Sequence, residues 1–272
     1  MKLALCQLDA TTNKQDNLRR AKEMLFRAAD NAAAMAILPE MFSITFESQL
    51  FYDVAEACPG GETAALLSEA AKETGMFIVG GSIPELCDGK LFNTSMSFLP
   101  NGQFAGKYRK AHLFDVDVPG VFRFMESDTI TRGDNLPLIL KDAPIKTGVS
   151  ICFDIRFPEF ARLAMLEGCD LFALPAAFAR TTGPRHWEIL MRTRALDNQL
   201  FVAAVAPAQS KNSHGHSMLV SPDGKVLIDC GEEECLQVVE VDLSLLQEMR
   251  QSIPVSTARR TDLYDLHPLP LS

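Results

Sequence analysis

Strand-like apolar runs alternate with segments of helical spacing along most of this 272-residue chain, and this alternation constrains the fold more than any other feature. The helical segments repeat apolar residues every three or four positions and cover 13–34, 62–74, 157–164, 187–196 and a last segment that ends near Arg250. The strand-like runs cover 2–8, 36–38, 76–81, 78–86 (which overlaps the run before it), 91–99, 103–108, 145–152, 170–174, 200–206, 218–220, 226–228 and 236–242. This order predicts a sheet that is covered by helices.

Turn sequences indicate that the sheet is mixed. Asp88-Gly89 and Asn101-Gly102 are typical of tight hairpins, and Pro222-Asp223-Gly224-Lys225 separates two further short runs. If helices cover only one face of such a sheet, its other apolar face must pack on a second sheet. We therefore predict an α/β (α+β) fold, a four-layer α-β-β-α sandwich of two mixed sheets.

The chain is expected to form one domain. No change in composition, internal repeat or low-complexity tract divides it, and its length suffices for one large core. We predict a single domain over 1–252 and an extended C-terminal arm over 253–272, where prolines recur.

Charge and cysteine content restrict partners and location. A formal net charge of −9 disfavours nucleic acid and anionic membranes as partners. The basic clusters at 107–110 and 180–194 could be binding patches, but solvated surface is an equally good interpretation. The seven cysteines are scattered without a CxxC pair, which is typical of reduced thiols in a cytoplasmic protein. The apolar run near the N-terminus is too short for an export signal, and none approaches the roughly 18 residues of a membrane span.

Three ionisable residues follow apolar strands. Cys152 ends a strand-like run just before a helical segment, where free backbone N–H groups can meet a negative charge. Glu40 follows the buried run at 36–38, and Lys110 closes the run that begins at 103. Singly, each has an ordinary interpretation: a packed thiol, a helix cap and a surface cation.

Together the three residues suit acyl transfer. A thiol needs a base or a positive neighbour to react at neutral pH, and a semi-buried glutamate can take its proton and later activate water. Lysine can stabilise the oxyanion, helped by the backbone N–H after the nucleophile, that of Phe153. A sheet that brings the three strand ends together would therefore create a cysteine hydrolase.

The segments around these residues resemble the three signatures of the nitrilase superfamily of carbon–nitrogen hydrolases: Leu38–Phe42, Tyr108–Phe114 and Ile151–Glu159. The resemblance implies that Cys152 is the nucleophile, Glu40 the general base and Lys110 the oxyanion stabiliser and proton donor. It also implies a thioester intermediate without metal or cofactor, the α-β-β-α sandwich, and a homodimer or higher homo-oligomer paired through the helices after the nucleophile strand. In that arrangement the C-terminal arm often lies across the partner.

Further family positions match outside the three signatures. Glu126 matches a second glutamate that positions the lysine, and an exposed loop charge is the alternative interpretation. Asp154 and Arg156 match residues that brace the loop after the nucleophile.

The substrate is expected to be an amide. Phe153-Asp154 stands where nitrilases proper carry tryptophan and glutamate, and 114–120, 181–187, 197–199, 215–217 and 260–264 are similar to the omega-amidases, which hydrolyse the terminal amide of 2-oxoglutaramate or 2-oxosuccinamate. Phe153 in place of a tyrosine, together with Arg180 and Arg185, departs from that pattern. Alternatives are an amidase for deaminated glutathione or an N-carbamoyl amino acid, and a catalytically silent binding protein.

A substrate carboxylate would need a cation. Arginine binds carboxylate through two parallel hydrogen bonds, and Arg180, which follows the run at 170–174, is the candidate. Phe114 and Phe178 are candidates for the pocket wall, and both could equally be core. His214 and His216 would face one way on a strand, but no third metal ligand stands near them in the sequence.

Overall fold

The apolar residues of strand β1 (Lys2–Gln7) point alternately into two different cores. Ala4 and Cys6 belong to a core that helices α1 (Lys14–Asp30) and α3 (Glu62–Thr74) cover, whereas Leu3 and Leu5 belong to a core that lies between two sheets. Because successive side chains of a strand face opposite ways, a strand that is apolar at every position must be buried on both faces. Strand β1 therefore lies between a helical layer and a second sheet. The computed structural model describes residues 1–118, 122–210 and 213–269.

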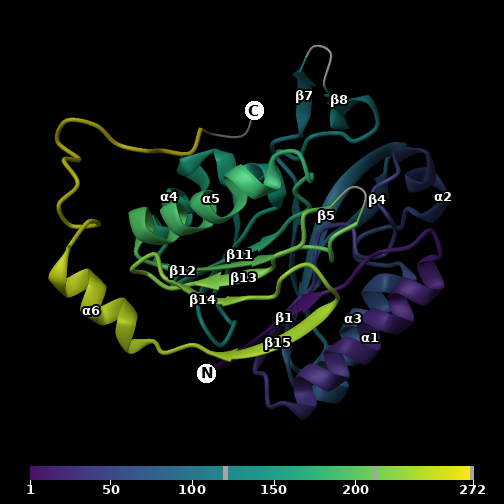
Figure 1. Cartoon of the computed structure of the whole chain (residues 1–272), viewed down its shortest axis with the longest axis horizontal. Helices are drawn as coiled ribbons and strands as arrows, with labels where there is room; N and C mark the ends of the chain where they lie inside the picture. Colours follow the sequence, from purple (N-terminus) through teal and green to yellow (C-terminus); the bar gives the residue numbers. More distant parts are fainter. Residues whose placement is uncertain (119–121, 211–212, 270–272) are drawn as a thin grey trace.

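Two mixed sheets pack face to face in the described part of the chain (Figure 1). The seven-stranded sheet has the order β15 (Cys235–Glu240), β1, β2 (Met35–Ile37), β3 (Phe77–Val79), β5 (Lys90–Phe98) and β4 (Ile83–Cys87), with β6 (Phe104–Arg109) paired to β5. The six-stranded sheet has the order β14 (Val226–Asp229), β13 (Met218–Val220), β12 (Phe201–Val205), β11 (Leu171–Pro175), β10 (Thr147–Val149) and β9 (Leu138–Leu140). A separate hairpin joins β7 (Asp115–Val118) and β8 (Phe122–Met125).

Helices cover the outer faces of both sheets. Residues of α4 (Pro158–Leu166) and α5 (Gly183–Asn198) share a core with the outward residues of β11 and β12, as α1 and α3 do on the opposite side (Figure 1). The shorter helices are α2 (Phe51–Val54), α6 (Ser244–Ser252) and the 3-10 turns η1 (Ser48–Leu50), η2 (Glu126–Asp128) and η3 (Cys152–Arg156). The predicted four-layer α-β-β-α sandwich is therefore confirmed.

Central strands of both sheets run parallel and end at one edge of the sandwich. β1, β2 and β3 are parallel, as are β10, β11 and β12. Glu40 follows β2, and Cys152 follows β10. The carboxyl ends of parallel strands form the usual binding edge of an α/β fold, so this edge is where a site is expected.

Several predicted boundaries are wrong. The runs at 76–81 and 78–86 form two strands, because Gly81 turns the chain with φ +54° beside Pro39, whose carbonyl oxygen would lie 2.1 Å from an added Cβ. The strand predicted at 145–152 ends at Val149, and α5 begins at Gly183, with Pro184 in its first turn, and not at Trp187. The β7–β8 hairpin and β9 were not predicted, because their runs are short and carry charged residues or prolines.

The chain beyond α6 lies outside both sheets. Over 253–269 it forms turns without a helix or strand, and Figure 1 shows this segment passing along the side of α4 and α5. Part of the predicted arm, 270–272, lies outside the described residues. Within the described ranges no helix combines the length and the apolar character that crossing a membrane requires.

Candidate active site

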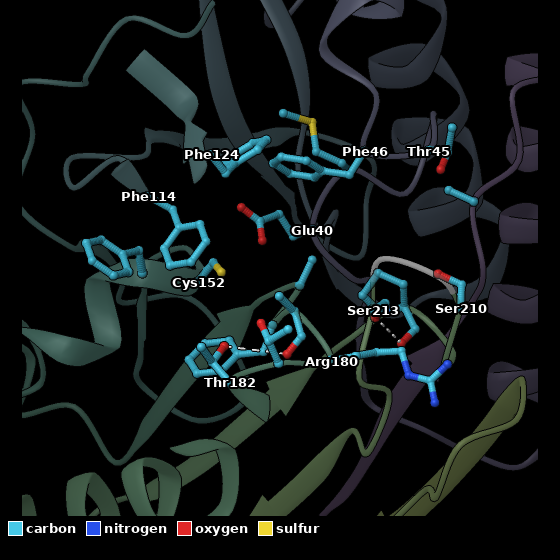
Figure 2. Close-up of a pocket in the computed structure, with 18 of the residues that line it drawn as sticks. Glu40, Thr45, Phe46, Phe114, Phe124, Cys152, Arg180, Thr182, Ser210 and Ser213 are labelled. Atoms are coloured by element: carbon cyan, nitrogen blue, oxygen red, sulfur yellow. Dashed lines mark hydrogen bonds between the residues drawn. The ribbon is translucent and has the colours of Figure 1, made fainter. Parts of the chain in front are cut away.

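A cavity of about 360 Å³ opens at the shared edge of the two sheets, and Glu40, Lys110 and Cys152 all line it. Figure 2 shows Glu40 and Cys152 at this cavity. The side chains come from three distant segments: the end of β2, the end of β6 and the start of η3. The three residues predicted from strand ends are therefore brought together at one cavity.

Cys152 sits on a strained turn. Its φ is +47°, a left-handed conformation that L residues rarely adopt outside functional turns. Asp154 holds the turn, because its carboxylate Oδ2 accepts a hydrogen bond of 2.9 Å from the backbone N–H of Ile151. The turn presents the sulfur to the cavity, and Phe153 is the second residue of η3, where a helical N–H lacks an intrahelical acceptor.

Lys110 lies between two glutamates. Its Nζ is 2.9 Å from Glu40 Oε1 and 2.8 Å from Glu126 Oε2, and all three side chains are buried, with exposures of 1–2%. Glu126 Oε2 also accepts a hydrogen bond of 2.7 Å from the backbone N–H of Phe114. Glu126 therefore anchors the lysine together with Glu40, so it is not an exposed loop charge.

Burial and charge shift the pKa of each ionisable group. Burial raises the pKa of Glu40, and the Lys110 ammonium only partly offsets this effect. Burial alone would lower the pKa of Lys110, but Glu126 and Glu40 outweigh it, so that the pKa rises well above its usual range. Burial and the Glu40 carboxylate raise the pKa of Cys152. The resting site therefore holds a neutral thiol beside a permanent cation.

The Glu40 carboxylate is turned toward the nucleophile. Figure 2 shows its oxygens pointing toward the sulfur of Cys152. Oε1 is held by Lys110 and by the Asn93 side chain, whereas Oε2 forms no ordinary hydrogen bond within the described ranges. The thiol is nonetheless close enough to interact with this carboxylate. Glu40 thus offers a free oxygen to the thiol proton.

Asp154 joins the lysine segment to the nucleophile turn. It accepts hydrogen bonds from the Tyr108 hydroxyl at 2.7 Å and from the backbone N–H of His112 at 3.0 Å, besides that of Ile151. The carboxylate is fully buried. The residues that supply these donors flank Lys110 and Cys152 in sequence, so Asp154 fixes the two segments relative to each other.

Aromatic rings form much of the cavity wall. Phe114 and Phe178, both predicted as wall residues, line the cavity with Phe46, Phe124 and Phe153. The Phe114 and Phe153 rings pack edge to face with centroids 5.2 Å apart. The cavity is therefore apolar around the sulfur, which strengthens electrostatic interactions there.

Two arginines line the cavity, and they differ in placement. Arg180, the predicted carboxylate ligand, lines it too, but it is exposed and its guanidinium turns away from Cys152 and Glu40 (Figure 2). Arg156, expected only to brace a loop, also lines the cavity, with its Cζ 5.2 Å from the Phe178 ring centroid. Its Nη2 is 3.1 Å from His186 Nδ1, and it pairs with no carboxylate in the described part of the chain. Sequence reasoning missed this role, although an arginine beside the nucleophile is a usable signal.

The two histidines considered for metal binding do not lie on a strand. His216 has φ +62°, and its ring stacks on that of His214 with centroids 4.6 Å apart. His216 Nδ1 is 3.0 Å from Asp229 Oδ1. No group of three or more His, Cys, Asp or Glu side chains suited to a metal occurs among the residues described.

Several known proteins are similar to this chain in sequence and in fold. The family model described as carbon–nitrogen hydrolase matches residues 2–251. Omega-amidase NIT2-A of Xenopus laevis is 46% identical over 270 residues, covering 97% of this chain and 97% of that protein. Omega-amidase NIT2 of Homo sapiens is 44% identical over 268 residues, covering 97% and 96%. Among solved structures, Saccharomyces cerevisiae Nit3, described as a member of branch 10 of the nitrilase superfamily, superimposes with a TM-score of 0.86 at 34% identity over 96% of both chains.

Proposed function

The chain belongs to the carbon–nitrogen hydrolase family, whose members cleave carbon–nitrogen bonds other than peptide bonds, and we propose that it is an omega-amidase. It hydrolyses the terminal amide of a small acid, such as 2-oxoglutaramate or 2-oxosuccinamate, to acid and ammonia. Relatives named omega-amidase at 44–46% identity over nearly the whole chain support this proposal. The observation that carries it is the buried arrangement of Glu40, Lys110 and Glu126 beside the Cys152 thiol.

Acylation begins with proton transfer from the thiol. In the proposed mechanism, Cys152 attacks the amide carbon while its proton moves to the free oxygen of Glu40. The developing oxyanion is stabilised by the Lys110 ammonium and the backbone N–H of Phe153. The tetrahedral intermediate collapses to a thioester, and ammonia leaves with the proton that Glu40 had taken.

Deacylation reuses the same groups. Glu40, again a carboxylate, takes a proton from water, and the hydroxide attacks the thioester carbon. The second oxyanion is held by the same donors. Its collapse releases the acid and returns the proton to the thiolate, which restores the neutral thiol of the resting site.

Lys110 is suited to this role because its charge is permanent. Two buried glutamates raise its pKa well above the usual range, so the ammonium persists at neutral pH. Glu126 balances that charge and also bonds the Phe114 backbone, and we assign it the role of holding the lysine.

The carboxylate that the amide substrate carries at its other end needs its own cation. Lys110 is already neutralised by two glutamates, whereas Arg156 is half-buried in the wall without a described carboxylate partner. We therefore assign the carboxylate to Arg156, between Phe153 and Phe178, and place Arg180 at the outer end of the cavity.

Ammonia release from a panel of amides tests the proposal. Turnover of 2-oxoglutaramate, with an acyl adduct on Cys152 seen by mass spectrometry, is the expected result. A protein that ignores this amide but cleaves deaminated glutathione or an N-carbamoyl amino acid is a different amidase, and a carbamoyl substrate would also release carbon dioxide. Absence of any adduct on Cys152 would favour a silent binding protein.

Assembly, domain limits and location are proposed on the family resemblance. We propose one catalytic domain over 1–252 with an arm over 253–272, and a cytoplasmic homodimer or higher homo-oligomer that binds no nucleic acid, membrane, metal or cofactor. Exposed Ile189 and Leu196 on α5, and Leu263 and Tyr264 on the arm, support pairing through this side. Sedimentation equilibrium tests the oligomer.

A further inference from the structure

A buried asparagine of strand β5 contacts both glutamates of the site. Asn93 is fully buried, and its Nδ2 lies 2.8 Å from Glu40 Oε1 and 3.4 Å from Glu126 Oε1. Asparagine is depleted in strands, so a buried one in a strand with partners on both sides needs a reason. Its two contacts with carboxyl groups of the site suggest that the reason lies in the site.

The chemistry of the carboxylates fixes the orientation of this amide. Only the NH₂ end can face two carboxylates, because the carbonyl end would repel them. Asn93 Oδ1 is left buried without a hydrogen bond to any described residue. An unpaired buried carbonyl costs free energy, so this amide is not placed for folding stability alone.

Asn93 also holds the lysine segment. Its backbone carbonyl accepts a hydrogen bond of 2.8 Å from the backbone N–H of Lys110. Lys110 in turn donates to the same Oε1 atoms that Asn93 contacts, at 2.9 Å on Glu40 and 3.1 Å on Glu126. One residue therefore touches the base, the cation and the supporting glutamate.

We propose that Asn93 is a positioning residue that keeps Glu40 ionised and aims its free oxygen at Cys152; this inference rests on the proposed amide hydrolysis. Two carboxylates and one ammonium leave the buried cluster with one uncompensated negative charge. A neutral donor stabilises that charge without adding another. It also fixes Oε1, so that rotation of the carboxylate cannot exchange the oxygen offered to the thiol.

The proposed role of Asn93 predicts that its loss changes the pH dependence of activity. The charged and titratable groups facing Glu40 are Lys110 after β6, Glu126 in η2 and Cys152 in η3. Without the Asn93 donor, only Lys110 opposes the mutual repulsion of the two glutamates. The protonated form of Glu40 is then favoured, so less base is present at neutral pH.

The test compares Asn93→Ala and Asn93→Asp with Ser95→Ala. Ser95 is buried two positions along the same strand and has no described contact with the carboxylates, so it is a matched control. We expect both Asn93 variants to lose about tenfold or more in kcat/KM at neutral pH, with the acid limb of the pH profile moved to higher pH. Asn93→Asp, which adds a third carboxylate, should move it further, and Ser95→Ala should stay close to wild type.

Two outcomes overturn the inference. One is an unchanged acid limb in folded Asn93 variants, even with lower rates, because a merely structural role would reduce activity at every pH alike. The other is an unchanged pH dependence of Cys152 alkylation by iodoacetamide, followed on the Cys152 peptide by mass spectrometry. The alkylation experiment needs no substrate. It therefore tests Asn93 even if wild-type protein releases ammonia from no amide, a result that would refute the proposed function alone.

Discussion

Replacing Lys110 by methionine tests the central element of the site. The side chain is 1% exposed and contacts Glu40 and Glu126 within 3 Å, so methionine keeps much of its volume while removing the only cation that touches both carboxylates in the described structure. Loss of one oxyanion donor costs about 3–4 kcal/mol of barrier, or about 100- to 1,000-fold in kcat. We expect a fall of at least this size, with a smaller change in KM, because the lost interaction belongs to the transition state.

The same substitution should make stability depend on pH. Breaking a buried ion pair by removing one partner costs about 3–5 kcal/mol. The pKa of Glu40, already raised in the folded protein, then rises further, so that the folded chain keeps a proton that the unfolded chain releases near pH 4.3. Stability of Lys110→Met should therefore decrease as the pH rises from about 4.3 through the folded pKa.

The assay combines ammonia release with thermal unfolding at several pH values. Lys107→Met is the matched control, because Lys107 lies on β6 just before Lys110 but contacts Glu85 and the Cys58 backbone. A Lys110→Met protein with kcat within about tenfold of wild type would refute the oxyanion role. Stability that does not decrease with pH would refute the electrostatic account.

Three further results are expected. Cys152→Ala should abolish turnover and the acyl adduct while thermal unfolding stays near wild type; an adduct that persists would mean that another thiol reacts. Arg156→Gln should raise KM for an amide that carries a carboxylate by about tenfold or more, but not KM for an uncharged amide, and Arg180→Gln should have the smaller effect; the reverse order would return the anchor to Arg180. The acid limb of the wild-type kcat/KM profile should lie above about pH 4.3, because burial raises the pKa of Glu40, and a midpoint at or below that value would contradict the assigned base.

Burial explains why some predicted elements matched the structure closely. The helix at 62–74 is observed with the same bounds, because its apolar stripe faces α1 and the sheet while Gly75 ends it with φ +67°. The Asp88-Gly89 hairpin also forms as predicted, since both residues adopt the positive φ that such a turn requires. Local chemistry decides these features, so local sequence reveals them.

The residues of the site also divide into those that the local sequence predicts and those that it does not. Glu40, Lys110 and Cys152 were found because each follows an apolar strand, and strand ends can be recognised from a short window. Asn93 was missed, because nothing within a few residues of it shows that two glutamates, 53 and 33 positions away, end beside it. The sequence did not show which way the Arg180 guanidinium turns, because its direction depends on how the chain after β11 packs.

By itself the sequence determined most of the order of strands and helices along the chain, the two-sided burial that requires a second sheet, and the strand ends that carry the reactive groups. Only the tertiary structure decided that Asn93 reaches both glutamates, that a strained turn presents the sulfur, and that the Arg180 guanidinium turns away from Cys152. The physical reason is the distance along the chain over which each effect acts. Backbone preference and apolar periodicity act over a few residues, whereas burial and electrostatic interaction depend on distances between segments that only the folded chain sets.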